Sequence, residues 1–283
     1  MQRHGRAAKR RVAAEAGDNG KYKALARLGY ASRGVVYVIV GALAVLAAWG
    51  GGGGQTTDTK GALQSLMDEP FGWVLIGVLA LGLVAFAVWR AVQAFADADR
   101  HGSDGKALVI RGGMAVSAVT HLLLAVFAAS LAFGWGSAGG GSGDSGTQSW
   151  IAKLMQQPYG VWLVAIVGLS IIGAGIAQIV KGVKVKFEKR LDADESAMRW
   201  MRPVCRFGLI ARGIVFVIIG GFIGIAAWQS DPQEARGLAG ALETLRSQPY
   251  GEALLGVVAL GLIAFGIYCF VEAIYRRIGM GAG

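Results

Sequence analysis

The 283-residue sequence has little charge, few cysteines and few histidines. Charged residues make up 16% of the chain, whereas soluble domains usually carry about 25%. The two cysteines, Cys205 and Cys269, are too few for a disulfide scaffold, and we expect two free, buried thiols. No cysteine and histidine spacing typical of a metal site occurs, so we expect neither a metal nor another cofactor.

The sequence also lacks the motifs that carry enzyme chemistry. No Gly-x-x-x-x-Gly-Lys-Ser/Thr phosphate loop occurs. The segment Asp97–Gly102 resembles the start of a calcium loop, but its twelfth position is Leu108, where calcium binding requires a glutamate. We therefore expect no catalytic residues and no enzymatic activity.

What the sequence has in abundance is long apolar runs. Six are long enough to cross a bilayer, which takes about 20 residues each. They cover Tyr30–Trp49, Phe71–Phe95, Gly113–Trp135, Tyr159–Val180, Phe207–Trp228 and Tyr250–Ile274. The first run is longer than the apolar core of a signal peptide, so we expect it to be retained. The pattern predicts an all-α integral membrane protein with six transmembrane helices.

The six runs are three copies of one two-helix unit. An Arg-x-Gly motif precedes each first run and a Pro-aromatic-Gly motif precedes each second run. These motifs begin at Arg27, Arg111, Arg206, Pro70, Pro158 and Pro249. Copies one and three align without a gap at an offset of 179 residues, and copy two aligns at offsets of 84 and 88. Such internal repetition predicts three helical hairpins related by a pseudo-threefold axis.

The repeats set the expected domain boundaries. A basic N-terminal tail covers residues 1–24, the repeats cover 25–100, 107–182 and 204–277, and a linker covers 183–203. Before each second run, apolar residues at three-and-four spacing predict a short amphipathic helix. We expect this helix to lie on the outer surface with its apolar side toward lipid. We place each motif proline in the first turn of the second helix, where its missing N–H costs nothing.

Lysine and arginine are concentrated on one side of the expected membrane. Of the 28, 24 lie in the termini and the even-numbered loops, and four lie in the odd-numbered loops. The positive-inside rule then places both termini in the cytoplasm. We expect a multi-pass protein of the bacterial inner membrane. The net charge of +10 comes mostly from the lysines and arginines that set this orientation. We therefore expect no nucleic-acid partner.

Small residues recur seven positions apart in the first helix of each copy. Such positions lie on one helix face, and close packing over small residues holds helices together in lipid. We expect seven of them to face a neighbouring helix: Gly34, Gly41, Ala118, Ala125, Gly213, Gly220 and Gly224. The alternative is that glycine is simply common, with 45 in the chain.

A few polar residues fall inside the spans and form a candidate polar axis or vestibule. They are Arg33, Ser117, His121, Arg212 and Glu272. The two arginines either extend to inner-leaflet phosphates or line an anion-attracting vestibule. The histidine is either an aromatic packing position or a functional group. Glu272 could pair with either arginine.

The loop after the fourth span carries a basic cluster. It consists of Lys181, Lys184, Lys186, Lys189 and Arg190. Such clusters attract anionic lipid headgroups, so we consider it a lipid-headgroup site. The alternative is a solvated linker whose charge only enforces topology.

Together these motifs resemble a bacterial family, the domain of unknown function 1206. The similarity rests on Arg-x-Gly…Arg-Gly-x-x-[Tyr/Phe] at Arg27–Tyr37 and Arg206–Phe216, on the three [Gln/Glu]-Pro-[Phe/Tyr]-Gly motifs, and on the threefold plan over residues 25–277. The resemblance implies a bacterial multi-pass membrane protein and supplies no catalytic residues. Copy two departs from the pattern, with Ser117 and His121 in place of the arginine and the aromatic residue.

Two functions remain open on the sequence. The first, which we favour, is a structural or accessory protein that binds membrane lipid, a membrane partner protein or further copies of itself. The second is a small-solute or ion transporter or channel with its site on the pseudo-threefold axis. A polar hollow lined by Arg33, Ser117, His121 and Arg212 would favour transport, and a glycine-packed axis would favour the accessory role.

Overall fold

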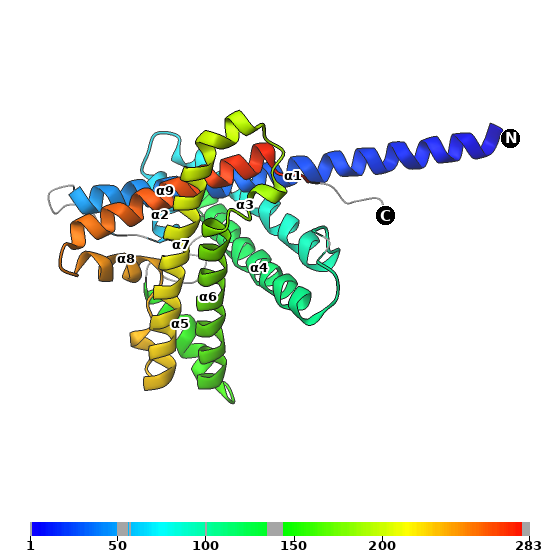
Figure 1. Ribbon diagram of the computed structural model, residues 1–283. Helices are drawn as coiled ribbons and strands as arrows, with labels where there is room; N and C mark the ends of the chain where they lie inside the picture. Colours follow the sequence, from blue (N-terminus) through cyan, green and yellow to red (C-terminus); the bar gives the residue numbers. More distant parts are fainter. Residues whose placement is uncertain (1, 50–55, 57, 100, 135–143, 279–283) are drawn as a thin grey trace.

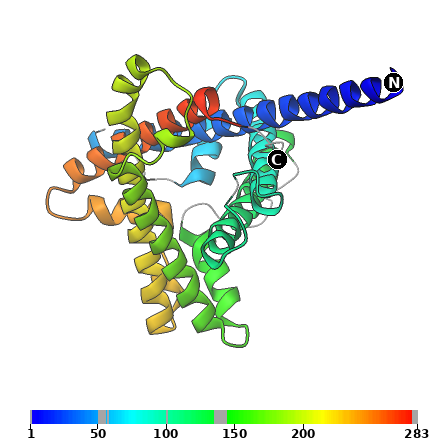
Figure 2. The ribbon, with the colours of Figure 1, turned by 45° about the vertical axis from the view of Figure 1, so that its right-hand side comes forward.

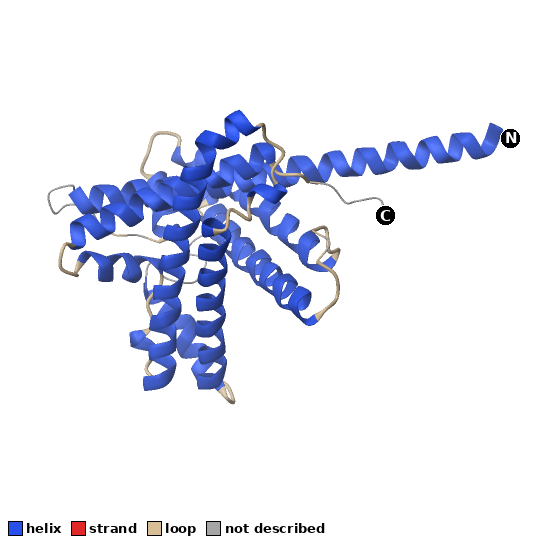
Figure 3. Cartoon of the chain, in the orientation of Figure 1, coloured by secondary structure: helices blue, strands red, loops and turns tan. Residues whose placement is uncertain are grey.

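The computed structural model of the chain describes residues 2–49, 56, 58–99, 101–134 and 144–278. Figure 3 shows helices joined by loops. No strand occurs among the described residues, and a single backbone bridge joins Leu191 to Arg276. Trp135, the expected end of the third span, lies outside the described residues.

Six long helices form at the six apolar runs. They are α1 (Gln2–Trp49), α3 (Gly72–Phe95), α4 (Gly105–Phe133), α6 (Gly160–Val183), α7 (Glu195–Gln229) and α9 (Gly251–Tyr275). Each contains a stretch long and apolar enough to cross a membrane. The predicted fold class is confirmed. The first half of α1 extends away from the bundle (Figure 1), and α7 begins inside the segment expected to be a linker.

One short helix precedes the second long helix of each repeat. These short helices are α2 (Thr59–Met67), α5 (Asp144–Met155) and α8 (Leu238–Arg246). Two 3-10 turns lie at Glu188–Arg190, before α7, and at Pro232–Glu234, before α8. The expectation that the apolar sides of the short helices face lipid is wrong for α2 and α8. Leu63 and Leu242 are fully buried in the main core of the bundle, because an apolar helix face is buried as well by protein as by lipid. Ile151 of α5 packs in a separate cluster with α6 and α7.

The Pro-aromatic-Gly motif forms a tight turn before each second long helix. The prolines lie two residues before the helix and not in its first turn. The aromatic residues Phe71, Tyr159 and Tyr250 adopt left-handed backbone conformations, with φ of 60°, 60° and 61°. The glycine that follows is required by sterics, since a Cβ on Gly72 would lie 2.6 Å from the carbonyl oxygen of Met67.

The closest helix pairs form between repeats. The helices α1 and α9, α3 and α4, and α6 and α7 pack along each other. Figures 1 and 2 show these three pairs running in different directions. Within repeats, α1 packs on α3 and α7 packs on α9, whereas α4 and α6 of repeat two barely touch. The helices therefore form an incomplete ring, and we call its opening the α4–α6 seam.

Glycine brings backbones close together in two of the three pairs. A Cβ on Gly34 would lie 3.0 Å from the carbonyl oxygen of Gly266 in α9. A Cβ on Gly213 would lie 2.7 Å from the carbonyl oxygen of Gly175 in α6. Close packing over small residues is the usual way in which helices associate in lipid.

The other predicted packing residues lie as follows. Cβ atoms on Gly41 and Gly220 would lie 2.9 Å and 2.7 Å from backbone carbonyl oxygens of α9 and α6. In α4, Ala125 is buried and Ala118 is half-buried. A Cβ on Gly224 would meet no atom within 4 Å. The Gly224 backbone still lies against α6, because a Cβ on Gly168 would lie 3.1 Å from the Gly224 nitrogen.

The bundle has two different ends. At the short-helix end, where α2, α5 and α8 lie, the interior is filled by the main apolar core and by the separate cluster around α5. We call the opposite end, where α3 and α6 finish, the arginine end. Residues 184–194 cover this end, with Phe187 and Leu191 buried against Tyr268. The linker is therefore packed onto the bundle, and its backbone is joined to α9 by a hydrogen bond of 2.7 Å from Asp192 N–H to the carbonyl of Tyr275.

Candidate functional site: a cationic cavity at the arginine end

A cavity of 170 Å³ lies among the helices at the arginine end. Six cations and one carboxylate line it. They are Arg33, Arg90, Lys181, Arg190, Arg212, Arg276 and Glu272, joined by Gln178, Leu209, Phe265 and Tyr268. Every long helix except α4 contributes at least one of these residues. We call this hollow the cationic cavity.

Two of its cations are paired with carboxylates. Arg276 lies 2.5 Å from Glu272 Oε1 and 3.2 Å from Asp99 Oδ2. Arg190 lies 3.0 Å from the same Asp99 oxygen, to which Gln93 also donates a hydrogen bond of 2.8 Å. Burial opposes the charged form of Arg276, yet its pKa is raised above the ordinary value because Tyr30, Glu272 and Asp99 surround it.

The other four cations have no carboxylate within 4.0 Å among the described residues. They are Arg33, Arg90, Lys181 and Arg212. Arg33 is only 6% exposed, and the Nε atoms of Arg33 and Arg90 are buried without a hydrogen-bond partner in the part of the chain that the structure describes. An unpaired buried charge costs several kcal/mol. The cavity therefore contains positive charge that the described residues do not compensate.

Aromatic rings hold two of these arginines in place. The Arg33 Cζ atom lies 4.9 Å from the Phe265 ring centre and 5.2 Å from that of Phe86. The Arg212 Cζ atom lies 4.1 Å from the Phe216 ring centre and 4.5 Å from that of Phe265. Cations are attracted to the faces of aromatic rings. The rings orient both guanidinium groups, and the Arg33 Nε–H has no partner among the described residues.

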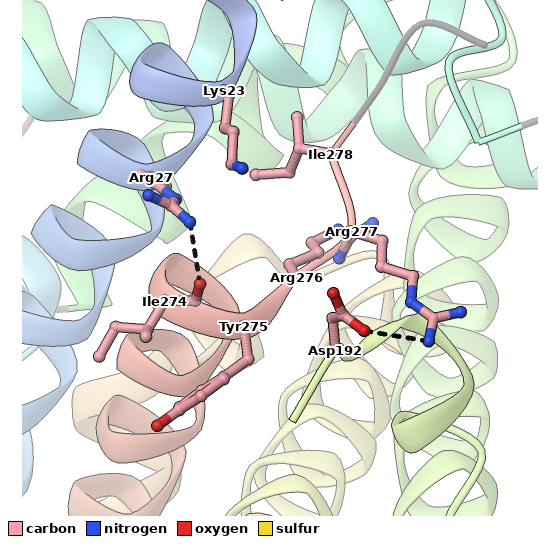
Figure 4. Close-up of a pocket in the computed structure, with 8 residues that line it drawn as sticks. All are labelled: Lys23, Arg27, Asp192, Ile274, Tyr275, Arg276, Arg277 and Ile278. Carbon is pink, nitrogen blue, oxygen red and sulfur yellow. Dashed lines mark hydrogen bonds and ion pairs between the residues drawn. The ribbon is translucent and has the colours of Figure 1, made fainter. Parts of the chain in front are cut away.

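A second hollow opens on the surface at the same end. It has a volume of 560 Å³, and Figure 4 shows the residues that line it. Arg27 donates a hydrogen bond of 3.2 Å to the carbonyl of Ile274, and Arg277 lies 3.2 Å from Asp192. The side chains of that ion pair are 66% and 77% exposed, so water screens their charges. The charges of this surface pocket are therefore less in need of an anionic ligand than those of the cationic cavity.

Comparison with known proteins identifies the family. The family model described as Domain of Unknown Function (DUF1206) matches residues 28–97, 112–185 and 207–276, one match for each repeat. The chain belongs to this family. It is also similar to the uncharacterized protein YxxB of Bacillus subtilis (strain 168), with 35% identity over 261 residues that cover 90% of this chain and 92% of that protein. No solved structure matches the chain.

The structure divides the predicted polar axis of this DUF1206 protein. Arg33, Arg212 and Glu272 line the cationic cavity, whereas Ser117 and His121 do not. The His121 ring lies 4.6 Å from the Phe86 ring, and its Nδ1 atom is 2.8 Å from the carbonyl oxygen of Ser117.

Glu272 pairs with neither of the arginines considered for it. Its partner is Arg276, one helical turn further along the chain, and residues at this spacing are neighbours on a helix. Arg212 instead donates hydrogen bonds to the Tyr37 hydroxyl, at 2.8 Å, and to the Gln178 amide oxygen.

The predicted lipid-headgroup cluster is also divided. Lys181 and Arg190 line the cavity, where Lys181 Nζ donates a hydrogen bond of 2.5 Å to the Tyr268 hydroxyl. The side chains of Lys184, Lys186 and Lys189 are exposed.

Sequence reasoning did not place Arg90, Gln178 or Arg276 in a site. The available signal was repeat register, because Arg90 and Gln178 occupy equivalent positions near the ends of α3 and α6. Among the described residues no group of three or more histidine, cysteine, aspartate or glutamate side chains is placed to hold a metal ion. Cys205 and Cys269 are free and buried.

Proposed function

We propose that this protein is an accessory protein of the bacterial cytoplasmic membrane, without catalytic activity, that binds an anionic lipid headgroup in the cationic cavity. The observation that carries the proposal is the charge of four cavity cations that no carboxylate within 4.0 Å balances among the described residues. Arg33 and Arg212 are buried, and Arg90 and Lys181 are half-buried. A phosphate group supplies the missing negative charge. Its oxygens also accept hydrogen bonds from guanidinium N–H groups in a geometry that arginine favours.

The depth of the cavity supports a lipid as the source of that phosphate. Arg33 and Arg212 each lie 16 residues before the tryptophan at the other end of the span, Trp49 and Trp228. At 1.5 Å per residue this is about 24 Å along the helix, in a hydrocarbon core about 30 Å thick. The distribution of lysine and arginine favours the arginine end as the cytoplasmic end. A headgroup of the inner leaflet is then within reach of the cavity.

Transport is the second candidate, because an anion path along the pseudo-threefold axis would begin with such a cavity. The filled core at the short-helix end argues against it. Val40, Leu79, Val215 and Leu262, from four different long helices, are buried in one apolar cluster there. Passage of an anion would require this core to part. Binding at one end of the bundle needs no such movement.

Lipid retention tests the proposal. The purified protein in mild detergent is titrated with phosphatidylglycerol or with phosphatidylcholine, and bound lipid is measured by native mass spectrometry. We expect the Arg33→Gln/Arg212→Gln variant to bind phosphatidylglycerol about tenfold more weakly. The matched control Lys184→Gln/Lys186→Gln removes two exposed charges and should bind as the wild type does. Equal binding of the two lipids, or an unchanged cavity variant, would overturn the proposal.

A flux measurement separates binding from transport. The wild-type protein is reconstituted in vesicles loaded with chloride or inorganic phosphate, and His121→Ala and Arg33→Gln are measured beside it. We expect the anion efflux from vesicles that contain the protein to equal the efflux from loaded vesicles without protein. Efflux that the wild type supports and Arg33→Gln loses would establish transport in place of the accessory role.

A further inference from the structure

We propose that the lipid enters the cationic cavity sideways through the α4–α6 seam and that its acyl chains lie between α4 and α6 beside Ala174. This inference rests on the proposed function and adds the position of the whole ligand. It follows from a difference between repeat two and the other repeats at one pair of equivalent positions.

In repeats one and three, a phenylalanine closes the contact between the two long helices. A Cβ on Gly29 of α1 would lie 2.6 Å from Phe86 Cα in α3. A Cβ on Gly208 of α7 would likewise lie 2.6 Å from Phe265 Cα in α9. The two rings are 0% and 1% exposed, and they are the same rings that flank Arg33. Phe265 lines the cavity directly, and Phe86 supports the wall from behind through its contact with Arg33.

Repeat two lacks this wall. The repeat offsets place Gly113 at the glycine position and Ala174 at the phenylalanine position. A Cβ on Gly113 would meet no atom within 4 Å, and Ala174 is exposed. A methyl group stands where the other repeats have a ring, and at this place α4 and α6 do not pack.

The seam leads to the cavity. Gln178 follows Ala174 by one helical turn, so the two residues share one side of α6. Gln178 and Lys181 line the cavity and are only half-buried, so it is not sealed on this side. The helix α4 contributes nothing to the lining. The open side of the cavity thus faces the gap in the helix ring.

The two parts of this site match the two parts of a phospholipid. Away from the cavity, the same side of α6 carries Val167 and Ile171, which are apolar and partly exposed. The spans of α4 and α6 are 22% and 17% buried, against 44–67% for the other four. An anionic lipid satisfies both the cations and the apolar walls. Free phosphate would satisfy only the cations, and an apolar partner helix would satisfy only the walls.

The experiment restores the missing ring. Ala174→Phe places at the seam the residue that closes repeats one and three, and Ala174→Leu is a milder second variant. Ile176→Phe is the matched control, because two residues turn the side chain about 200° around the helix. Each variant is titrated with phosphatidylglycerol and with glycerol 3-phosphate, a soluble probe without acyl chains. Circular dichroism checks that each variant is folded.

We expect both Ala174 variants to bind phosphatidylglycerol about tenfold more weakly than the wild type and the control. Binding of glycerol 3-phosphate should stay unchanged, because the cations remain. Equal lipid binding by Ala174→Phe and Ile176→Phe would overturn the route while the proposed function stood. Equal weakening of both probes would overturn it too, because the substitution would then act on the cavity itself.

Two further results bear on the occupant. A second copy of the chain that is retained by the wild type and lost from Ala174→Phe would replace the lipid by a protein contact. Failure of the wild type to bind any anionic lipid would overturn the proposed function together with this inference. If glycerol 3-phosphate binds too weakly to measure, the comparison of Ala174→Phe with Ile176→Phe on lipid alone decides the route.

Discussion

The guanidinium of Arg212 in α7 donates a hydrogen bond of 2.8 Å to the hydroxyl of Tyr37 in α1. The bond joins repeat three to repeat one at the edge of the cationic cavity. Tyr37→Phe keeps the ring, whose centre lies 5.1 Å from Arg212 Cζ, and removes only the acceptor.

We expect Tyr37→Phe to lower the free energy of unfolding by about 1.5–3 kcal/mol, as for a hydrogen bond to a charged group. Thermal unfolding in detergent, followed by circular dichroism, measures the change. Tyr250→Phe is the control, because Tyr250 is 87% exposed and should show no effect. Equal melting of wild type and Tyr37→Phe would show that the bond adds no stability.

The glycines that face phenylalanine provide a test within the repeats. Gly29→Ala introduces a methyl group against the Phe86 backbone, and we expect it to destabilise the protein by about 1–3 kcal/mol through overpacking. Gly113→Ala makes the same change at the equivalent position of repeat two, where the methyl group meets no atom within 4 Å. It should leave stability unchanged or raise it by up to about 1 kcal/mol, since alanine favours helix. If both substitutions lowered the free energy of unfolding equally, the contact between α4 and α6 would be as close as in the other repeats, and the seam would be contradicted.

The hydrogen bonds of Asp97 predict that the stability of the protein depends on pH. Backbone N–H groups of His101 and Gly102 donate to its carboxylate at 2.8 Å each, and they hold the pKa of Asp97 below its ordinary value of 3.8. Because the folded-state pKa is the lower one, the contribution is complete above the ordinary value and is lost as pH falls through the folded-state pKa.

Asp97→Asn should therefore be less stable than the wild type by a constant amount at neutral and weakly acidic pH. The difference should shrink as pH drops below the ordinary aspartate range. Asparagine tolerates the left-handed backbone of this position, φ 48°, so that backbone strain does not confuse the comparison. The melting temperatures of both proteins are measured across the acid range. A difference in melting temperature that grows toward low pH would contradict the prediction.

Asp144 links repeat two to repeat three at the short-helix end. Its Oδ1 atom accepts hydrogen bonds from the N–H groups of Gly237, at 2.8 Å, and Gly240, at 3.1 Å, at the start of α8. Asp144→Ala should cost about 0.5–2 kcal/mol, as for the loss of a helix cap. Asp194 also precedes a helix but makes no capping bond with its side chain, so Asp194→Ala should cost less. Chemical unfolding in detergent compares the two, and an equal loss would argue against the capping role.

The sequence predicted the helices far better than their partners. Apolar length identified all six spans, and the repeat identified the three units, because both are properties of local composition. Periodicity shows which face of a helix is buried but not which helix covers it. The sequence therefore did not show that Gly34 packs against Gly266 of α9, which belongs to another repeat.

The cavity was only partly predictable for the same reason. Arg33 and Arg212 were evident as charges inside spans. Lys181 and Arg190 were assigned to the lipid surface, because nothing in their spacing shows that residues 184–194 cover the end of the bundle. The pairing of Glu272 with Arg276 depended on where α9 ends, and helix ends are the least certain part of a sequence-based assignment.

Each repeat contains two spans, so all three repeats have the same polarity. Every Pro-aromatic-Gly turn lies at one face of the molecule, and every helix junction that surrounds the arginines lies at the other. No internal symmetry of this chain interchanges the two faces, in contrast to proteins built from inverted repeats. Among the described residues the arginine end therefore has no counterpart at the short-helix end.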